Sequence, residues 1–159
     1  AGVPASVCAE ALSRFVPSGS RQNIYEKNGL HIIADCYNAS PESMTAALSV
    51  LRGFPGRRIA VLGDMLELGA YAGRLHRDMG AAVCGAADLL FTIGSAAEQI
   101  AEGAAARGMP RERIRVFPAD GHEAAAQALR EIVRPGDSLL FKASNRMNLK
   151  KVIERMGIS

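Results

Sequence analysis

The chain has 159 residues, of which 48% are hydrophobic and 22% charged, as expected for one folded globular domain with a substantial core. Its formal net charge of +3, with 5% aromatic residues and no tryptophan, is too weak a basis for nucleic-acid binding, so we expect no nucleic-acid partner. We also expect no membrane span, because no apolar run approaches the roughly 20 residues that a bilayer requires.

The first residues differ from the rest because they carry no strand pattern. Pro4 suits the first position of a helix, and apolar residues at helical spacing follow it before a loop at residues 17–20. The chain opens on Ala1 rather than Met. We therefore expect a short helix and linker over residues 1–20, and we expect the chain to be a piece of a longer protein.

Strand and helix patterns alternate along the rest of the chain. Asn28-Gly29, between two runs with strand character at 22–26 and 30–34, predicts a β-hairpin. Further strands are expected at 58–62, 89–93, 114–117 and 138–141, and helices at 41–52, 72–85, 96–107, 121–133 and 148–156. Short apolar strands without alternation are typical of sheets that helices cover on both faces. We therefore predict a doubly wound, Rossmann-like α/β fold, with a mostly parallel sheet and one antiparallel strand from the hairpin.

Candidate binding residues follow the strand at 30–34, since open parallel sheets bind ligands beyond the carboxyl ends of their strands. Asp35 ends this strand and Asn38 follows it, and an acid with an amide at such a place can hold hydroxyls or amines. Ser40 precedes Pro41 and is expected to cap the next helix, so that capping alone is an alternative interpretation of Ser40. The chain contains no glycine-rich phosphate loop, so we expect a nucleotide's phosphates to be held elsewhere.

Two other loops that follow strands contain candidate binding residues. Asp64 and Glu67 place two carboxylates after the strand at 58–62, where they could act as acid and base, bind a cation or hold an ammonium group. A solvated loop is the alternative. Lys142 ends the last strand and Ser144 stands where a helix is expected to begin, so both suit a carboxylate or phosphate; the alternative is that Lys142 is a surface cation.

Metal and nucleophile chemistry find no support in the sequence. The three histidines share no metal-ligand spacing, and neither a Ser-His-Asp nor a Cys-His arrangement can be argued from the spacings. We expect no metal ligand and no catalytic residue in this chain. The three cysteines are an odd number and predict reduced thiols in a cytoplasmic protein. These residues are His31, His76 and His122, and Cys8, Cys36 and Cys84.

Three segments together resemble one family. Residues 35–44, Asp-Cys-Tyr-Asn-Ala-Ser-Pro-Glu-Ser-Met, resemble the D-x-Y-N-A-N-P-x-S-M signature of Mur ligases, with Ser40 in place of the second Asn. Residues 61–69 match the family's V-L-G-D-M-x-E-L-G segment, and residues 141–144 resemble its V-K-G-S segment, with Ala143 in place of Gly. Arg21 matches the arginine that opens the C-terminal domain in this family.

The resemblance implies a fold, a reaction and partners. It implies that residues 21–159 are the C-terminal α/β domain of a three-domain, monomeric, cytoplasmic ligase, and that residues 1–20 connect it to a central ATPase domain of the same chain. The implied reaction is ATP-dependent amide formation, in which D-alanyl-D-alanine (D-Ala-D-Ala) is joined to UDP-MurNAc-tripeptide through an acyl phosphate. The implied cofactors are ATP and Mg²⁺, with the metal ligands in the central domain, so this domain alone is expected to be inactive.

The resemblance also implies roles for single residues. It implies that Arg21, Asp35, Asn38 and Ser40 contact ATP, and that Asp64, Glu67, Lys142 and Ser144 are the candidates for contacting D-Ala-D-Ala. Two alternatives stay open: a sibling amide ligase of the folate polyglutamate type, and a stand-alone nucleotide-binding α/β module.

Overall fold

The computed structural model describes residues 2, 4, 6–8 and 23–159, so that Arg21 and most of the predicted hinge segment lie outside the described residues. Within these described residues there are six strands: β1 (Asn23–Lys27), β2 (Leu30–Asp35), β3 (Arg58–Gly63), β4 (Leu89–Ile93), β5 (Ile114–Phe117) and β6 (Ser138–Lys142). From residue 23 onward the α-helices are α2 (Pro41–Arg52), α3 (Ala72–Cys84), α4 (Glu98–Ala106), α5 (His122–Ile132) and α6 (Lys150–Arg155). Short 3₁₀ helices are η1 (Gly69–Tyr71), η2 (Arg111–Arg113) and η3 (Asn145–Met147).

The strands form one sheet in the order β1-β2-β6-β3-β4-β5. The pair β1–β2 is antiparallel and the other four pairs are parallel. This confirms the predicted doubly wound, mostly parallel α/β fold with an antiparallel hairpin strand. No helix among the described residues has the length and the apolar character needed to cross a bilayer.

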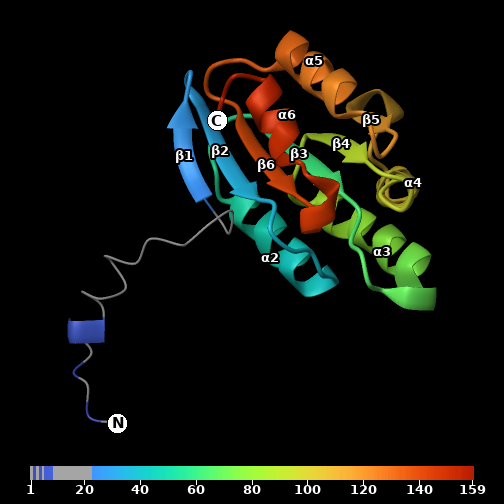
Figure 1. Cartoon of the computed structure of the whole chain (residues 1–159), viewed down its shortest axis with the longest axis horizontal. Coiled ribbons are helices and arrows are strands. Elements are labelled where there is room, and N and C mark those ends of the chain that lie inside the picture. Colours follow the sequence, from blue (N-terminus) through green and yellow to red (C-terminus); the bar gives the residue numbers. More distant parts are fainter. Residues whose placement is uncertain (1, 3, 5, 9–22) are drawn as a thin grey trace.

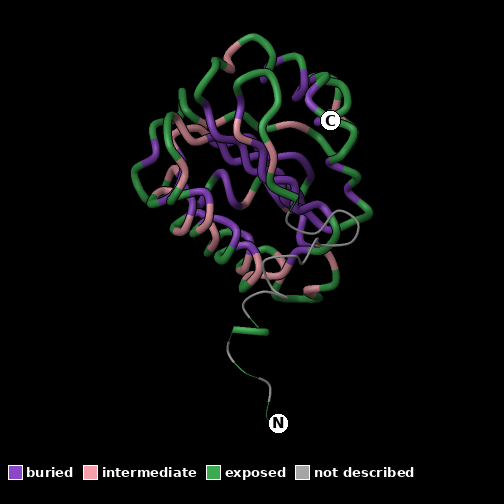
Figure 2. Tube along the Cα trace, turned by 90° about the vertical axis from the view of Figure 1, so that its left-hand side faces the viewer, coloured by how far each residue is buried: buried purple, intermediate pink, exposed green. Residues whose placement is uncertain are grey.

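Helices cover both faces of the sheet (Figure 1). The core cluster that α5 and α6 cover contains Ile32 and Leu139, while the cluster that α2, α3 and α4 cover contains the next residue along each strand, Ile33 and Leu140. Successive strand residues thus face opposite apolar layers, which explains why these strands show no polar alternation. In Figure 2 the buried trace runs through the middle of the molecule, with exposed segments around it.

The chain reverses its winding direction next to β6. From β2 it passes through α2 to β3, leaving a place beside β2 that β6 later fills. The segment after β2 leads to α2 on one face of the sheet, whereas the segment after β6 leads to α6 on the opposite face (Figure 1). In folds of this type ligands bind beyond the carboxyl ends of two strands whose loops diverge in this way, and we call this region of the protein the β2–β6 crevice.

Candidate functional site

The crevice between β2 and β6 contains a buried ion pair. Asp35 and Lys142 are register partners at the ends of these strands. The Lys142 Nζ atom donates to Asp35 Oδ2 at 2.6 Å and to the Asn38 carbonyl oxygen at 2.9 Å. The Lys142 side chain is only 1% exposed and that of Asp35 11% exposed. Lys142 is therefore an interior residue rather than the surface cation that was the alternative interpretation.

The segment after β2 is ordered by its own polar side chains. The Asn38 Oδ1 atom accepts a hydrogen bond from the Ala39 amide at 2.9 Å. Ser40 is the N-cap of α2: its Oγ atom accepts from the Ser43 amide at 3.3 Å, and the Ser40 amide donates to Ser43 Oγ at 2.9 Å. The predicted cap is confirmed, and it is a reciprocal capping box. A contact of Asn38 or Ser40 with ATP stays a prediction.

Cys36 lies beside the ion pair, but its thiol is unreactive. Its side chain is buried, and Sγ donates to the Phe141 carbonyl oxygen at 3.5 Å. Burial raises the pKa of Cys36 to about 12, and the neighbouring Asp35 carboxylate adds to the effect. Because the thiolate is the nucleophilic form, Cys36 is not a reactive thiol at neutral pH.

Asp64, after β3, faces into the protein. It is 6% exposed, and its Oδ1 atom accepts a hydrogen bond from the buried Ala97 amide at 2.7 Å. Gly94 makes this possible: its φ is +126°, and a Cβ atom there would lie 2.2 Å from Asp64 Oδ1. The carboxylate therefore fastens the segment after β4 to the end of β3.

Glu67 has a different environment from Asp64. It is exposed and has a φ of +68°, a left-handed conformation that is unfavourable for this residue type. Such strain is retained where the surroundings fix it, and it is concentrated at functional segments. Of the two carboxylates predicted at this rim, Glu67 alone is solvent-exposed.

His76 anchors the same loop from α3. It is fully buried, and its Nε2 atom accepts a hydrogen bond from the Met65 amide at 2.8 Å. Nδ1 is then the protonated nitrogen and donates to the Ala72 carbonyl oxygen at 2.7 Å. His76 is thus a structural residue, and its two hydrogen-bond partners were not predicted from the sequence.

Ser144 ties the end of β6 to the loop after β3. Its amide donates to the Asp64 carbonyl oxygen at 3.0 Å, and its Oγ atom accepts from the Leu66 amide at 2.9 Å. The helix expected from residue 148 is preceded by η3 and by Asn148 with a φ of +51°, and α6 itself has six residues. Arg146 in η3 is exposed, and no described residue forms a hydrogen bond or ion pair with it.

The predicted residues thus form two connected groups. Lys142 contacts both Asp35 and Asn38, and Ser144 contacts the backbone of the Asp64 segment. The pairing of Asp35 with Lys142 was missed, although opposite charges at the ends of two parallel strands were a usable signal. No hydrogen bond from another described residue reaches Asp35 Oδ1. This oxygen can therefore accept a hydrogen bond from a ligand hydroxyl or amine.

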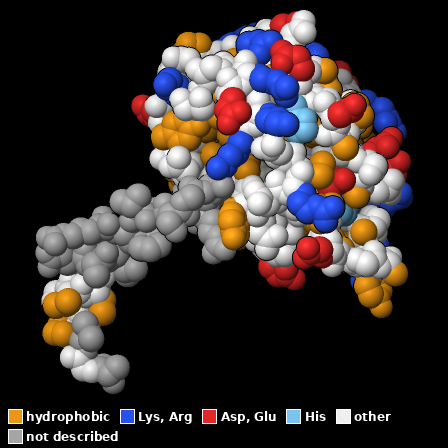
Figure 3. All heavy atoms as spheres, in the orientation of Figure 1, with side chains coloured by type: hydrophobic (Ala, Val, Ile, Leu, Met, Phe, Trp, Pro, Cys, Tyr) orange, Lys and Arg blue, Asp and Glu red, His pale blue; other side chains and the backbone are white. Residues whose placement is uncertain are grey.

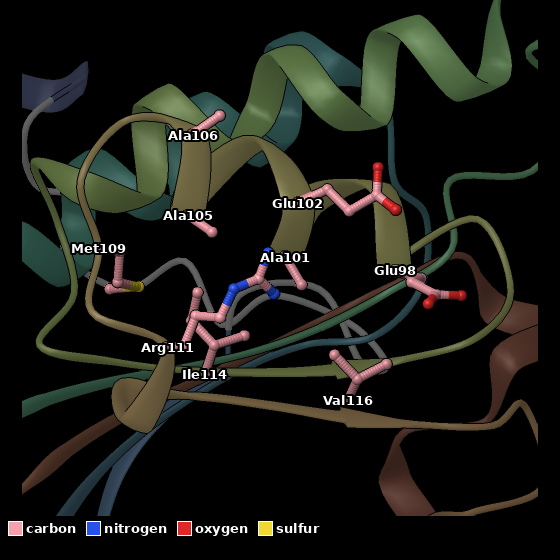
Figure 4. Close-up of a pocket in the computed structure, with 9 residues that line it drawn as sticks. All are labelled: Glu98, Ala101, Glu102, Ala105, Ala106, Met109, Arg111, Ile114 and Val116. Carbon is pink, nitrogen blue, oxygen red and sulfur yellow. The ribbon is translucent and has the colours of Figure 1, made fainter.

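Other parts of the described surface are less suited to chemistry. No group of three or more His, Cys, Asp or Glu side chains that could hold a metal ion occurs among the described residues. On the face shown in Figure 3, basic and acidic side chains are interspersed. A hollow of about 600 Å³ lies between α4 and β5, with Arg111 reaching across it and Glu98 and Glu102 on α4 (Figure 4). It shares no residue with the β2–β6 crevice.

Known proteins resemble this chain over almost its whole length. Residues 20–145 match a family model described as Mur ligase, glutamate ligase domain. The UDP-N-acetylmuramoyl-tripeptide–D-alanyl-D-alanine ligase of Bacillus subtilis (strain 168) is 37% identical over 158 residues, which cover 96% of this chain and 34% of that relative. The ligase of the same name from Synechocystis is 36% identical over 143 residues, covering 89% of this chain and 30% of the relative.

Solved structures give the same picture. The crystal structure of MurF ligase from Thermotoga maritima in complex with ADP has a TM-score of 0.76 and 29% identity, covering 96% of this chain and 36% of that one. MurF from Acinetobacter baumannii has a TM-score of 0.81 and 26% identity, covering 98% of this chain and 34% of that one. The chain therefore spans about a third of the length of these relatives.

Proposed function

We propose a function that proceeds from one fact: this chain belongs to the Mur ligase family, and its residues 20–145 correspond to the glutamate ligase domain of that family. We propose that it is the C-terminal domain of an ATP-dependent ligase that joins D-Ala-D-Ala to UDP-MurNAc-tripeptide in peptidoglycan precursor synthesis. The observation that carries this proposal is the 37% identity over 96% of the chain to a ligase of that name.

The crevice between β2 and β6 is the proposed contact with ATP. Asp35 supports this role because its Oδ1 atom has no hydrogen bond from another described residue and stands at the carboxyl edge of the sheet. A carboxylate in this place is suited to ribose hydroxyls. Arg21, Asn38 and Ser40 are proposed to lie near the nucleotide as well. The described residues offer no phosphate loop and no metal cluster, so we assign the phosphates and Mg²⁺ to a central domain of the same protein.

The loop after β3 and the turn after β6 are the proposed contacts with the dipeptide. Glu67 is exposed and is suited to steering the ammonium group of D-Ala-D-Ala. The Ser144 hydroxyl keeps its own hydrogen available as a donor, because Oγ is the acceptor for the Leu66 amide. Arg146, exposed and without a described partner, offers the positive charge that suits the dipeptide carboxylate. Asp64 is buried beneath this loop, where its carboxylate accepts the hydrogen bond from the Ala97 amide.

The chemistry follows from how these loops hold substrates. ATP, when bound, supplies the phosphoryl group that activates the peptide carboxyl group. The residues of this chain orient the nucleotide through the β2–β6 crevice and hold the dipeptide by its carboxylate. Glu67 is suited to steering the ammonium group, which loses its proton before the free amine attacks the activated carbon. Closing the domain over both substrates also excludes water that would otherwise hydrolyse the activated group. Free thiols among the described residues suit the proposed cytoplasmic location.

The full-length protein that contains this domain provides the test. We expect ADP release that requires both UDP-MurNAc-tripeptide and D-Ala-D-Ala, together with a product whose mass equals that of the two joined substrates minus water. Replacing D-Ala-D-Ala by D-glutamate or by L-glutamate tests the sibling ligases. Dependence on either of these amino acids in place of the dipeptide would overturn the proposal.

The isolated chain of residues 1–159 provides the complementary test. We expect it to unfold cooperatively but to release no ADP in the presence of both substrates, because the described residues provide nothing that holds the β- and γ-phosphates. ADP release that depends on D-Ala-D-Ala in this fragment would show that the domain contains its own phosphate site.

A further inference from the structure

Lys142 has no free path to a substrate in this structure. Its ammonium group is buried between β2 and β6, and two of its three N–H bonds are directed at Asp35 Oδ2 and at the Asn38 carbonyl oxygen. Because the side chain is only 1% exposed, contact with a ligand would require the ammonium group to move and to give up one of these bonds, where an unpaired charge is costly. Its function must therefore be sought in the groups that it holds.

These groups are the acid and the loop of the proposed nucleotide site. The bond to Asp35 Oδ2 fixes the carboxylate by one oxygen and leaves Oδ1 as the open acceptor. The bond to the Asn38 carbonyl oxygen fixes the backbone three residues further on, just before the N-cap Ser40. One buried cation thus sets both the rotation of the carboxyl group and the course of the segment that leads into α2.

We propose that Lys142 is a positioning residue for ribose recognition: it holds Asp35 so that Oδ1 accepts a hydrogen bond from a ribose hydroxyl of ATP. This inference rests on the proposed function and adds to it. The bond to the ribose is made by Asp35, and Lys142 acts through Asp35 without touching the nucleotide. A purely apolar pair at this place would stabilise the fold about as well, so that an ion pair with one open oxygen points to orientation of a ligand.

The experiment measures ribose discrimination in the full-length enzyme. The ratio of kcat/KM for ATP to kcat/KM for 2′-deoxy-ATP and for 3′-deoxy-ATP reports the hydrogen bond to each hydroxyl. We expect the unsubstituted enzyme to prefer ATP over one of the two analogues by about 10-fold or more, the effect of losing one charge-assisted hydrogen bond. In Lys142→Met we expect this ratio to fall to within about threefold of unity, with the larger change in KM for ATP rather than for D-Ala-D-Ala.

Arg57→Met is the matched control. Arg57 also pairs with a buried carboxylate, that of Asp137, but at the opposite edge of the sheet. This variant removes a comparable cation and lowers stability, and it should leave the ATP-to-deoxy-ATP ratio unchanged. If Lys142→Met does not fold, Lys142→Gln is the variant to use. Its neutral side chain is one atom shorter, so it loses the charge-assisted bond to Asp35 while keeping a polar group in the buried space, and we expect the ratio to fall several-fold.

The outcomes distinguish failure of the positioning role from failure of the proposed function. A Lys142 variant that keeps the full ratio overturns the positioning role, and so does an unsubstituted enzyme that shows no preference between ATP and either analogue. A rise in KM for D-Ala-D-Ala alone also overturns it and returns Lys142 to the dipeptide. In each of these cases amide formation itself is still observed, whereas loss of the proposed function would appear as no amide product with the unsubstituted enzyme.

Discussion

The parallel sheet has ion pairs at two opposite edges, one where its strands begin and one where they end. The carboxylates of these pairs differ in how many of their oxygen atoms accept hydrogen bonds. At the edge where the strands begin, Asp137 accepts from Arg57 Nε at 3.2 Å through Oδ1, and from Arg57 Nη2 at 2.6 Å and the Arg134 amide at 2.8 Å through Oδ2. At the edge where the strands end, Asp35 receives one hydrogen bond from the described residues, and only through Oδ2. Both carboxylates are largely buried.

A second pair at the first edge follows the same rule. Asp88 receives the Arg58 amide at 2.8 Å and two guanidinium bonds at 3.3 Å, so that both of its oxygens are occupied. Burial by itself raises the pKa of Asp88, but the bonds from Arg58 outweigh this and hold that pKa below its usual value. Saturated carboxylates join strands to loops, whereas a carboxylate with an open oxygen has capacity left for a ligand. Changes to the saturated carboxylates Asp137 and Asp88 should therefore alter stability, whereas a change to Asp35 should alter function.

The largest expected effect on stability is at the first edge. Asp137→Ala removes three hydrogen bonds and leaves the Arg57 guanidinium, which is 31% exposed, without its partner. We expect the free energy of unfolding to fall by about 3 kcal/mol, the lower end for breaking a buried pair. Urea unfolding of the isolated domain measures it, with Asp120→Ala, an exposed acid, as the control. A raised KM for ATP in the folded full-length variant would contradict the assignment of this edge to stability.

Asp64→Ala tests an acid that lies at the functional edge but is used structurally. The buried Ala97 amide loses its acceptor, so we expect the free energy of unfolding to fall by about 2 kcal/mol. Asp64→Asn, whose amide oxygen can still accept this bond, should recover most of the loss. If the carboxylate also contacts the dipeptide, Asp64→Asn will raise KM for D-Ala-D-Ala without a matching loss of stability.

Ser40→Ala separates capping from nucleotide contact. Loss of the Ser40 cap on α2 should lower the free energy of unfolding by about 1 kcal/mol, and Ser40→Asn, an equally good cap, should restore it. Kinetics of the full-length variants then decide the second role. If Ser40 only caps, both variants will keep the KM for ATP; if it also contacts the nucleotide, Ser40→Ala will raise that KM.

Glu67 should give the smallest change in stability, and of opposite sign. Glycine adopts a φ of +68° without strain, so Glu67→Gly should raise the free energy of unfolding by roughly 0.5 kcal/mol after its greater flexibility in the unfolded chain is taken into account. KM for D-Ala-D-Ala should rise if the carboxylate steers the ammonium group. Glu67→Asn, which also tolerates this conformation, is the control for charge alone. An unchanged KM in both variants would remove Glu67 from the dipeptide site.

The sequence predicted the elements well because their signals are local. From residue 23 onward, the Asn28-Gly29 turn, the Ser40 cap and the runs of apolar residues placed each strand and each α-helix within two residues of its observed ends, whereas the 3₁₀ helices were not predicted. The helix expected at 148–156 differs from the prediction because it begins at Lys150 and is preceded by a 3₁₀ turn and the left-handed Asn148. Such a turn depends on how the chain leaves β6 and packs on the sheet, which no local pattern specifies.

The structure confirms that the candidate residues Asp35, Asp64 and Lys142 lie at the carboxyl ends of strands, but the sequence did not predict their contacts. The rule that ligands bind at carboxyl strand ends identified Asp35, Asp64 and Lys142. Which way each side chain faces depends on distant partners: Asp64 turns inward because Gly94 leaves room for it, and Lys142 is buried because β2 lies beside β6. These contacts join segments far apart in sequence, and a single sequence does not reveal them.

The place of β6 in the sheet has a consequence for how the protein is made. β6 is synthesised after the other five strands of this sheet, yet it lies between β2 and β3 and pairs with both. Until residues 138–142 have left the ribosome, β2 and β3 each present an open edge, which is a template for pairing with other chains. The ion pair of the site joins residues 107 positions apart. A nascent chain that stops before Ser138 therefore exposes the unpaired edges of β2 and β3 together. Pairing of β6 with both strands removes these aggregation-prone edges and forms the binding crevice in the same step.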